Sequence, residues 1–266
     1  MDSQQLKIFL IMAPQLLVGT CLLLCRRSAA SPQVQEPRWM GTCWDAIAFF
    51  SVALIFLFVL PDLAYSLSPE SEHISYLCSF LGTCSYALFL PRLLRSNAFS
   101  FSCGLSPAQL SLGRALLRGA LHYLRAAPLL FLADILWLYL LSVLCATGLP
   151  LSLEPQELLW ELENASPLML AIIIPITCAV APFVEEVLFR GGVHRCLKFF
   201  WGKWPAALLS SLLFAALHGN WAASFPLFVL SLLLVRVYEL EGRLFPCVCL
   251  HGLFNLNGVL LTFASR

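Results

Sequence analysis

Two adjacent carboxylates follow a stretch of the sequence that carries no charge. Glu185 and Glu186 come directly after the run from Leu168 to Val184. One charged residue at the centre of a membrane helix costs roughly 2.5–3.5 kcal/mol on insertion scales, so the pair needs a counter-charge, neutralisation or water. Arg190 lies four residues after Glu186, on the same face of a helix, and is a suitable ion-pair partner. Glu185 is turned about 100° from that face and has no such partner in its own segment, which makes it a candidate for chemistry.

Two later apolar segments supply side chains that suit a reaction with Glu185. One segment contains Phe214 and His218, and the other contains His251 and Asn255 at the same spacing of four residues. A carboxylate in an apolar cavity is a stronger base than one in water, so it removes a proton from a water molecule more readily. Imidazole and amide N–H groups donate hydrogen bonds to the oxyanion that forms when a peptide carbonyl is attacked. These residue types therefore fit hydrolysis of a peptide bond by activated water.

The three motifs resemble, in order and spacing, those of the CAAX prenyl protease type II and bacteriocin-processing (CPBP) family of intramembrane proteases. The family pattern is Glu-Glu-x-x-x-Arg on one membrane helix, Phe-x-x-x-His on another and His-x-x-x-Asn on a third. Each motif is intact here, and the resemblance covers roughly residues 172–261. The resemblance implies an intramembrane endopeptidase whose substrate is a membrane-tethered or lipidated peptide or protein. A prenylated CAAX-type C-terminus and another hydrophobic tail or leader peptide both remain open.

The resemblance also implies a role for each motif residue. Two residues activate water, namely Glu185 and His218. Two residues stabilise the tetrahedral intermediate, namely His251 and Asn255. Three residues support the site: Glu186 and Arg190 form a structural pair, and Phe214 forms part of the wall.

A metal-dependent reaction would use some of the same side chains. Glu185, His218 and His251 are suitable zinc ligands, with water in the fourth position. The sequence contains no His-Glu-x-x-His motif, so each ligand would have to come from a different helix. We therefore favour a glutamate mechanism without a cofactor and keep zinc as the alternative.

The composition indicates a membrane protein. Of the residues, 60% are hydrophobic and 12% are charged, and the mean hydropathy is +0.84, whereas a soluble domain carries about 25% charged residues. The net charge of +1 gives no indication of nucleic-acid binding. Most of the 11 cysteines lie in apolar runs without metal-site spacing, so they are expected to behave as small hydrophobic residues.

Eight apolar runs are candidates for membrane spans in the 266 residues. They are residues 8–25, 46–60, 74–90, 127–149, 168–189, 205–218, 222–237 and 244–263. Of the 16 Lys and Arg residues, 14 lie in the loops after the first, third, fifth and seventh runs or, in the case of Arg236, at the very end of the seventh run, and the other loops contain none. By the positive-inside rule, both termini then face away from the cytosol. We predict an all-α polytopic protein of about eight transmembrane helices, in a bacterial inner membrane or the endoplasmic reticulum membrane, with a polar cavity open towards the cytosol.

The expected organisation has two parts. Residues 1–126 would hold the N-terminal transmembrane helices and an amphipathic cytosolic linker at 106–124, and residues 127–266 would form the catalytic membrane domain. The fifth span would end at Phe189, before an interfacial segment at 194–204. Glu185 would then lie about 7 Å and His218 about 20 Å from the cytosolic edge, a mismatch that requires tilt, thinning or a bend near Gly202.

Two other function classes use similar residues. A non-catalytic binding or scaffold protein of the same fold would not need the complete set of polar residues in the three motifs. A proton-coupled transporter also places Glu, His and Arg within the membrane, but its usual sign is a pair of Gly/Pro-interrupted helices in two repeated halves, which this sequence lacks. Three histidines have no evident role by sequence: His73, His122 and His194.

Overall fold

The computed structural model describes residues 3–24, 43–67, 81–86, 112–151, 153, 162 and 165–265, and the regular structure in these ranges is helical. Within them, five helices are long and apolar enough to cross a membrane: Gln4–Leu24, Leu112–Ala146, Pro167–Trp201, Trp221–Glu241 and Phe245–Ala264. Two further apolar helices are shorter, Ile47–Leu57 and Lys203–Leu217. The all-α polytopic class is confirmed, whereas the number eight is not. Most of the third expected span, 74–90, lies outside the described residues.

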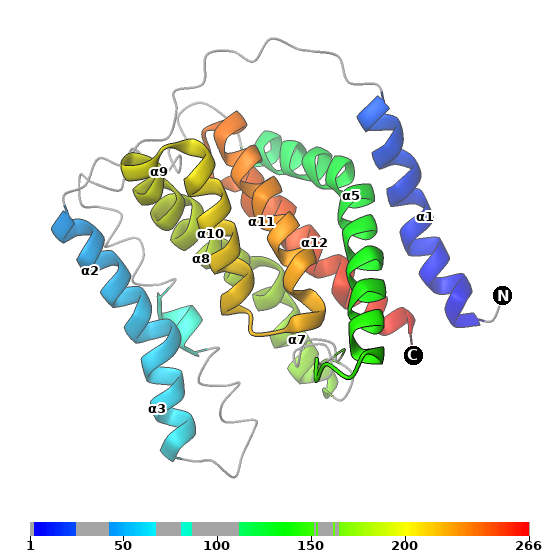
Figure 1. Ribbon diagram of the computed structural model, residues 1–266, viewed down its shortest axis with the longest axis horizontal. Coiled ribbons are helices and arrows are strands. Elements are labelled where there is room, and N and C mark those ends of the chain that lie inside the picture. Colours follow the sequence, from blue (N-terminus) through cyan, green and yellow to red (C-terminus); the bar gives the residue numbers. More distant parts are fainter. Residues whose placement is uncertain are drawn as a thin grey trace.

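The N-terminal part consists of α1, α2, η1, α3 and α5. Their bounds are Ser3–Leu24 for α1, Cys43–Leu54 for α2, Ile55–Val59 for the π-helical η1, Leu60–Leu67 for α3 and Leu112–Ala146 for α5. α5 is one continuous helix that joins most of the expected amphipathic segment to the fourth expected span, and the expected boundary at 126/127 falls inside it. Pro128 lies within α5, and the helix changes direction along its length (Figure 1), as expected where proline removes a helical hydrogen bond.

A continuous helix of 35 residues carries the fifth expected span. It comprises α7 (Pro167–Pro175), η3 (Ile176–Val180), α8 (Ala181–Glu186), η4 (Val187–His194) and α9 (Arg195–Trp201), of which η3 and η4 are π-helical. The helix thus continues past the expected end of the span at Phe189 and includes part of the expected interfacial segment. The side chain of Arg190, expected in a loop, is fully buried inside the fold.

Gly202 turns the chain from this long helix into α10 (Lys203–Leu217). Its φ of 79° is in the left-handed region that glycine adopts without a steric penalty. Glu185 precedes Gly202 by 17 residues and His218 follows it by 16. In an antiparallel pair these two side chains lie at similar depths. The mismatch in depth expected from the sequence is thereby removed.

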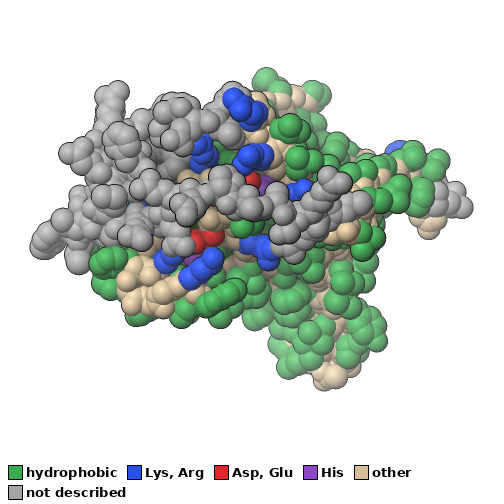
Figure 2. Space-filling model, turned by 90° about the horizontal axis from the view of Figure 1, so that it is seen from above, with side chains coloured by type: hydrophobic (Ala, Val, Ile, Leu, Met, Phe, Trp, Pro, Cys, Tyr) green, Lys and Arg blue, Asp and Glu red, His purple; other side chains and the backbone are tan. Residues whose placement is uncertain are grey.

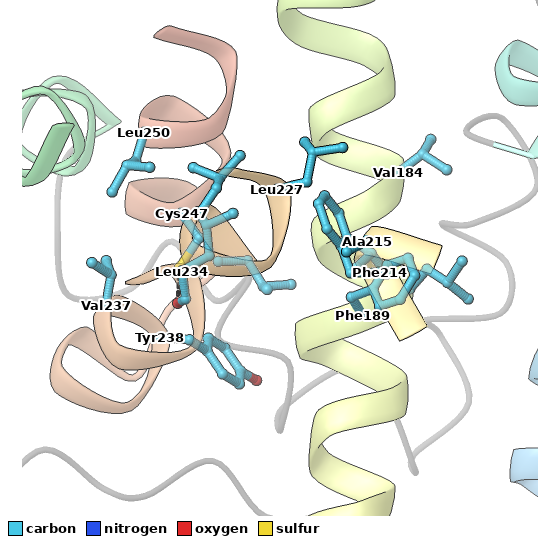
Figure 3. Close-up of a cluster of buried hydrophobic side chains, with 14 of the residues drawn as sticks. Val184, Phe189, Phe214, Ala215, Leu227, Leu234, Val237, Tyr238, Cys247 and Leu250 are labelled. Atoms are coloured by element: carbon cyan, nitrogen blue, oxygen red, sulfur yellow. Dashed lines mark hydrogen bonds between the residues drawn. The ribbon is translucent and has the colours of Figure 1, made fainter. Parts of the chain in front are cut away.

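The last two helices, α11 (Trp221–Glu241) and α12 (Phe245–Ala264), complete the part that surrounds the motifs. Buried apolar side chains of the long helix, α10, α11 and α12 meet in one cluster, part of which is shown in Figure 3. Phe189 and Phe214 pack edge to face there, with ring centroids 5.0 Å apart. This cluster fixes the helices that carry the three motifs relative to one another.

Basic side chains gather on one end of the molecule, around acidic and histidine side chains (Figure 2). At the end of α11, Glu239 pairs with Lys198 at 2.6 Å and Glu241 pairs with Arg118 at 2.7 Å. Both chain termini lie at the opposite end of the helices (Figure 1). This asymmetry agrees with the charge pattern of the loops, and the orientation in the membrane stays a prediction.

Candidate active site

Glu186 is at the centre of a buried charged cluster. Its Oε1 lies 2.9 Å from Nη1 of Arg190 and 2.9 Å from Nδ1 of His251. All three side chains are buried, at 0%, 0% and 2% exposure. The pair with Arg190 follows from the spacing of four residues in one helix. The contact with His251 joins α8 to α12, and the sequence did not indicate it.

Arg190 also reaches a third helix. Its Nη2 donates to Oγ of Ser231 at 2.8 Å and to the carbonyl oxygen of Ser231 at 3.0 Å. The guanidinium carbon lies 5.0 Å from the ring centroid of Phe214, within the range of a cation–π interaction. Phe214 therefore contacts the charged cluster directly. Ser231 belongs to no motif, and nothing in the sequence marked it.

Glu185 lies beside this cluster and faces both intramembrane imidazoles. Its Oε2 is 3.9 Å from Nε2 of His218 and 3.8 Å from Nε2 of His251. These separations are too long for direct hydrogen bonds, and Oε2 is buried without a hydrogen-bond partner among the described residues. They are in the range where a water molecule bridges two polar groups. The side chains of Glu185 and His218 are 27% and 26% exposed, so the cluster is accessible on their side.

Both imidazole rings are held through their Nδ1 atoms. Nδ1 of His218 lies 2.7 Å from the carbonyl oxygen of Phe214, one helical turn earlier, and Nδ1 of His251 contacts Glu186. A carbonyl and an ionised carboxylate only accept hydrogen bonds, so each Nδ1 is the donor. Both rings consequently direct Nε2 towards Glu185.

Asn255 is one helical turn from His251 but bonds to the backbone. Its Nδ2 donates to the carbonyl oxygen of Thr177 at 2.8 Å. In the π-helical register of η3, the N–H of Ala181 bonds five residues back to Ile176. Pro182 would bond next to Thr177 but has no N–H. Asn255 satisfies the carbonyl that this proline leaves open, and it joins α12 to η3.

A close approach of α12 to η3 sets the position of His251. A Cβ atom at the adjacent residue, Gly252, would collide with the carbonyl oxygen of Cys178. Only glycine therefore allows the two backbones to come this near. The His-x-x-x-Asn motif thus depends on Gly252, which lies between His251 and Asn255.

The zinc alternative would use the side chains around Glu185. Within the described part of the chain, no three His, Cys, Asp or Glu side chains are grouped so that they could hold a metal ion. Two nitrogen or oxygen ligands about 2.0 Å from a tetrahedral zinc lie about 3.3 Å apart. The separations of 3.8 and 3.9 Å around Glu185 are longer.

Two histidines that had no expected role are structural. Nε2 of His194 lies 3.0 Å from Oε1 of Glu239, and Nε2 of His122 lies 2.9 Å from Oε1 of Glu241. These contacts tie the end of α11 to η4 on one side and to α5 on the other. The sequence did not indicate either contact.

Comparisons with known proteins agree with the motifs. Residues 167–257, which contain all seven motif residues, match the family model described as type II CAAX prenyl endopeptidase Rce1-like. The UPF0177 protein YbdI of Lactococcus lactis subsp. lactis (strain IL1403) is 33% identical over 78 residues, which are 29% of this chain and 41% of that protein. The chain thus matches less than half of the length of this curated relative. No solved structure matches the chain.

Proposed function

We propose that this chain, whose residues 167–257 belong to the Rce1-like family of type II CAAX prenyl endopeptidases, is an intramembrane endopeptidase that uses glutamate-activated water. One observation carries the proposal. The unpartnered Oε2 of Glu185 lies between the Nε2 atoms of His218 and His251, at 3.9 and 3.8 Å. A carboxylate and two imidazoles converge there in an apolar setting, where an unpaired acidic group suggests chemistry.

In the proposed reaction, Glu185 takes a proton from a water molecule that also contacts Nε2 of His218. The resulting hydroxide attacks the peptide carbonyl carbon and forms a tetrahedral intermediate with a negative oxygen. The proton on Glu185 passes to the departing nitrogen as the C–N bond breaks, which returns the carboxylate and releases a carboxylic acid and an amine.

In the proposed reaction, Asn255 and His251 stabilise the negative oxygen. An amide nitrogen carries two N–H donors, so Asn255 keeps a second donor while the first bonds to Thr177. Nε2 of His251 donates only when the ring is doubly protonated, because Nδ1 already donates to Glu186.

The proposed substrate is a membrane-tethered or lipidated peptide whose scissile bond reaches the side where Glu185 and His218 are exposed. The family description points to prenylated C-termini, and the apolar surface of the helices suits a lipid chain beside the site. We place the site towards the cytosolic face, in line with the charge of the loops.

The test is a cleavage assay on the full chain in lipid vesicles, with a farnesylated CAAX peptide and the same peptide without the lipid. Wild type, Glu185→Gln and Asp62→Asn are compared, where Asp62 is an exposed carboxylate in α3. We expect cleavage of the lipidated peptide by wild type and Asp62→Asn, and a loss of at least about 10³-fold in Glu185→Gln. Equal cleavage by Glu185→Gln would refute the assignment.

The same cleavage assay with an added metal chelator tests the zinc alternative. Activity that survives chelation supports the metal-free reaction. Activity that chelation abolishes and zinc restores would instead make Glu185, His218 and His251 ligands of a metal. Binding of the lipidated peptide without cleavage by any variant would favour the scaffold alternative.

A further inference from the structure

We infer that Ser231, a residue of α11 outside the three motifs, is a positioning residue for the reaction because it fixes Arg190 and, through Arg190 and Glu186, the ring of His251. This inference rests on the proposed function. The four side chains form one chain of contacts across three helices, with polar separations of 2.8 to 3.0 Å. All of them are at most 2% exposed.

Ser231 provides both hydrogen-bond acceptors of one guanidinium nitrogen of Arg190. Nη1 bonds to Glu186, and Nη2 bonds to the hydroxyl and the carbonyl of Ser231. Nε of Arg190 is buried and has no hydrogen-bond partner among the described residues. The Ser231 hydroxyl is thus one of three polar contacts on this buried cation. Substitution of Ser231 by alanine removes this contact without removing a charge and without a change in the backbone.

A single oxygen atom of Glu186 links the position of Arg190 to that of His251. Oε1 of Glu186 contacts both Arg190 and His251, while Oε2 has no hydrogen-bond partner among the described residues. The rotation of the carboxylate is therefore set by its Oε1 contacts. A guanidinium that shifts after loss of the Ser231 hydroxyl moves this oxygen, and Nε2 of His251 moves relative to Glu185. Small misplacements of a catalytic group lower the rate strongly.

The experiment measures kcat and KM for Ser231→Ala, Ser231→Thr and Ser210→Ala with the lipidated peptide. Ser210 is a matched control, since it is 2% exposed and, among the described residues, its hydroxyl donates to the carbonyl of Ala207 within its own helix α10. We expect Ser231→Ala to lower kcat about tenfold, the effect of one lost charged hydrogen bond, with KM within about twofold because the contact does not bind substrate. Ser231→Thr keeps the hydroxyl and should recover most of kcat.

A second measurement combines Ser231→Ala with Glu186→Gln under single-turnover conditions with excess enzyme, so that slow variants still give rates. If Ser231 acts through Glu186, its substitution should lower the rate less than about threefold in the Glu186→Gln background. Rates are divided by the folded fraction found by thermal unfolding, so that a variant that folds poorly is not mistaken for one that is catalytically impaired.

Three results would overturn the inference: a kcat of Ser231→Ala equal to that of Ser210→Ala, a loss that appears only in KM, or an undiminished tenfold loss in the Glu186→Gln background. These results differ from a failure of the proposed function. In that case Glu185→Gln would cleave as well as wild type, or wild type would not cleave at all.

Discussion

Nδ1 of His251 lies 2.9 Å from Oε1 of Glu186, on a helix 65 residues earlier in the chain. The same oxygen is 2.9 Å from Nη1 of Arg190. One carboxylate oxygen thus holds a cation of its own helix and an imidazole of α12. In apolar surroundings such a network is strong when every group is paired and weak when one is removed.

Arg190→Met should lower the free energy of unfolding by about 3–5 kcal/mol, because it leaves the carboxylate of Glu186 buried without its cation. Thermal unfolding in detergent micelles measures the loss. Arg236→Met is the control, since Arg236 lies exposed on α11 and should change stability by no more than about 0.5 kcal/mol. Equal effects of the two substitutions would contradict a structural role of the buried pair.

Gly252→Ala should lower both stability and cleavage activity. The new Cβ collides with the carbonyl of Cys178 and pushes α12 away from η3, at a cost of about 1–3 kcal/mol, and His251 moves with it. Gly258→Ala is the matched control in the same helix, because a Cβ there meets no atom within 4 Å. It should stabilise the helix by about 0.5–1 kcal/mol, so a loss of stability there as large as at Gly252 would refute the collision.

Asn255→Ala should destabilise the fold by about 1–3 kcal/mol, in addition to its effect on cleavage, because the carbonyl of Thr177 loses its partner. Pro182→Ala restores an N–H in the helix next to that carbonyl. The cost of Asn255→Ala in unfolding experiments should therefore be smaller in the Pro182→Ala background, while cleavage should stay low. An undiminished cost would show that the proline is not the reason for the bond.

A polar network joins α1 to the rest of the molecule and should affect stability alone. The amide of Gln15 donates to Oδ1 of Asn257 at 2.8 Å and accepts from the hydroxyl of Tyr123 at 2.6 Å. Tyr123→Phe removes one hydrogen bond and should cost about 0.6 kcal/mol, with about twice that for Gln15→Leu. Unfolding measures the loss, and kcat should stay within about twofold of wild type. A large decrease in kcat would mean that α1 takes part in shaping the site.

Hydropathy was sufficient for the membrane class, and motif spacing was sufficient for the family resemblance that the family model confirms over residues 167–257. The sequence did not show that Arg190 is buried, because its burial depends on Ser231 and Phe214 from other helices. From the sequence alone, a buried charge with partners on other helices cannot be distinguished from a charge at the membrane surface.

The sequence by itself determined what is local. The pairing of Glu186 with Arg190 and the separate direction of Glu185 follow from 3.6 residues per turn, whatever surrounds the helix. Only the tertiary structure decided which groups meet across helices: His251 with Glu186, Ser231 with Arg190 and Asn255 with Thr177. The physical reason is that such contacts depend on the rotation and shift of whole helices, which are set by the packing of many side chains and by close approaches such as that at Gly252.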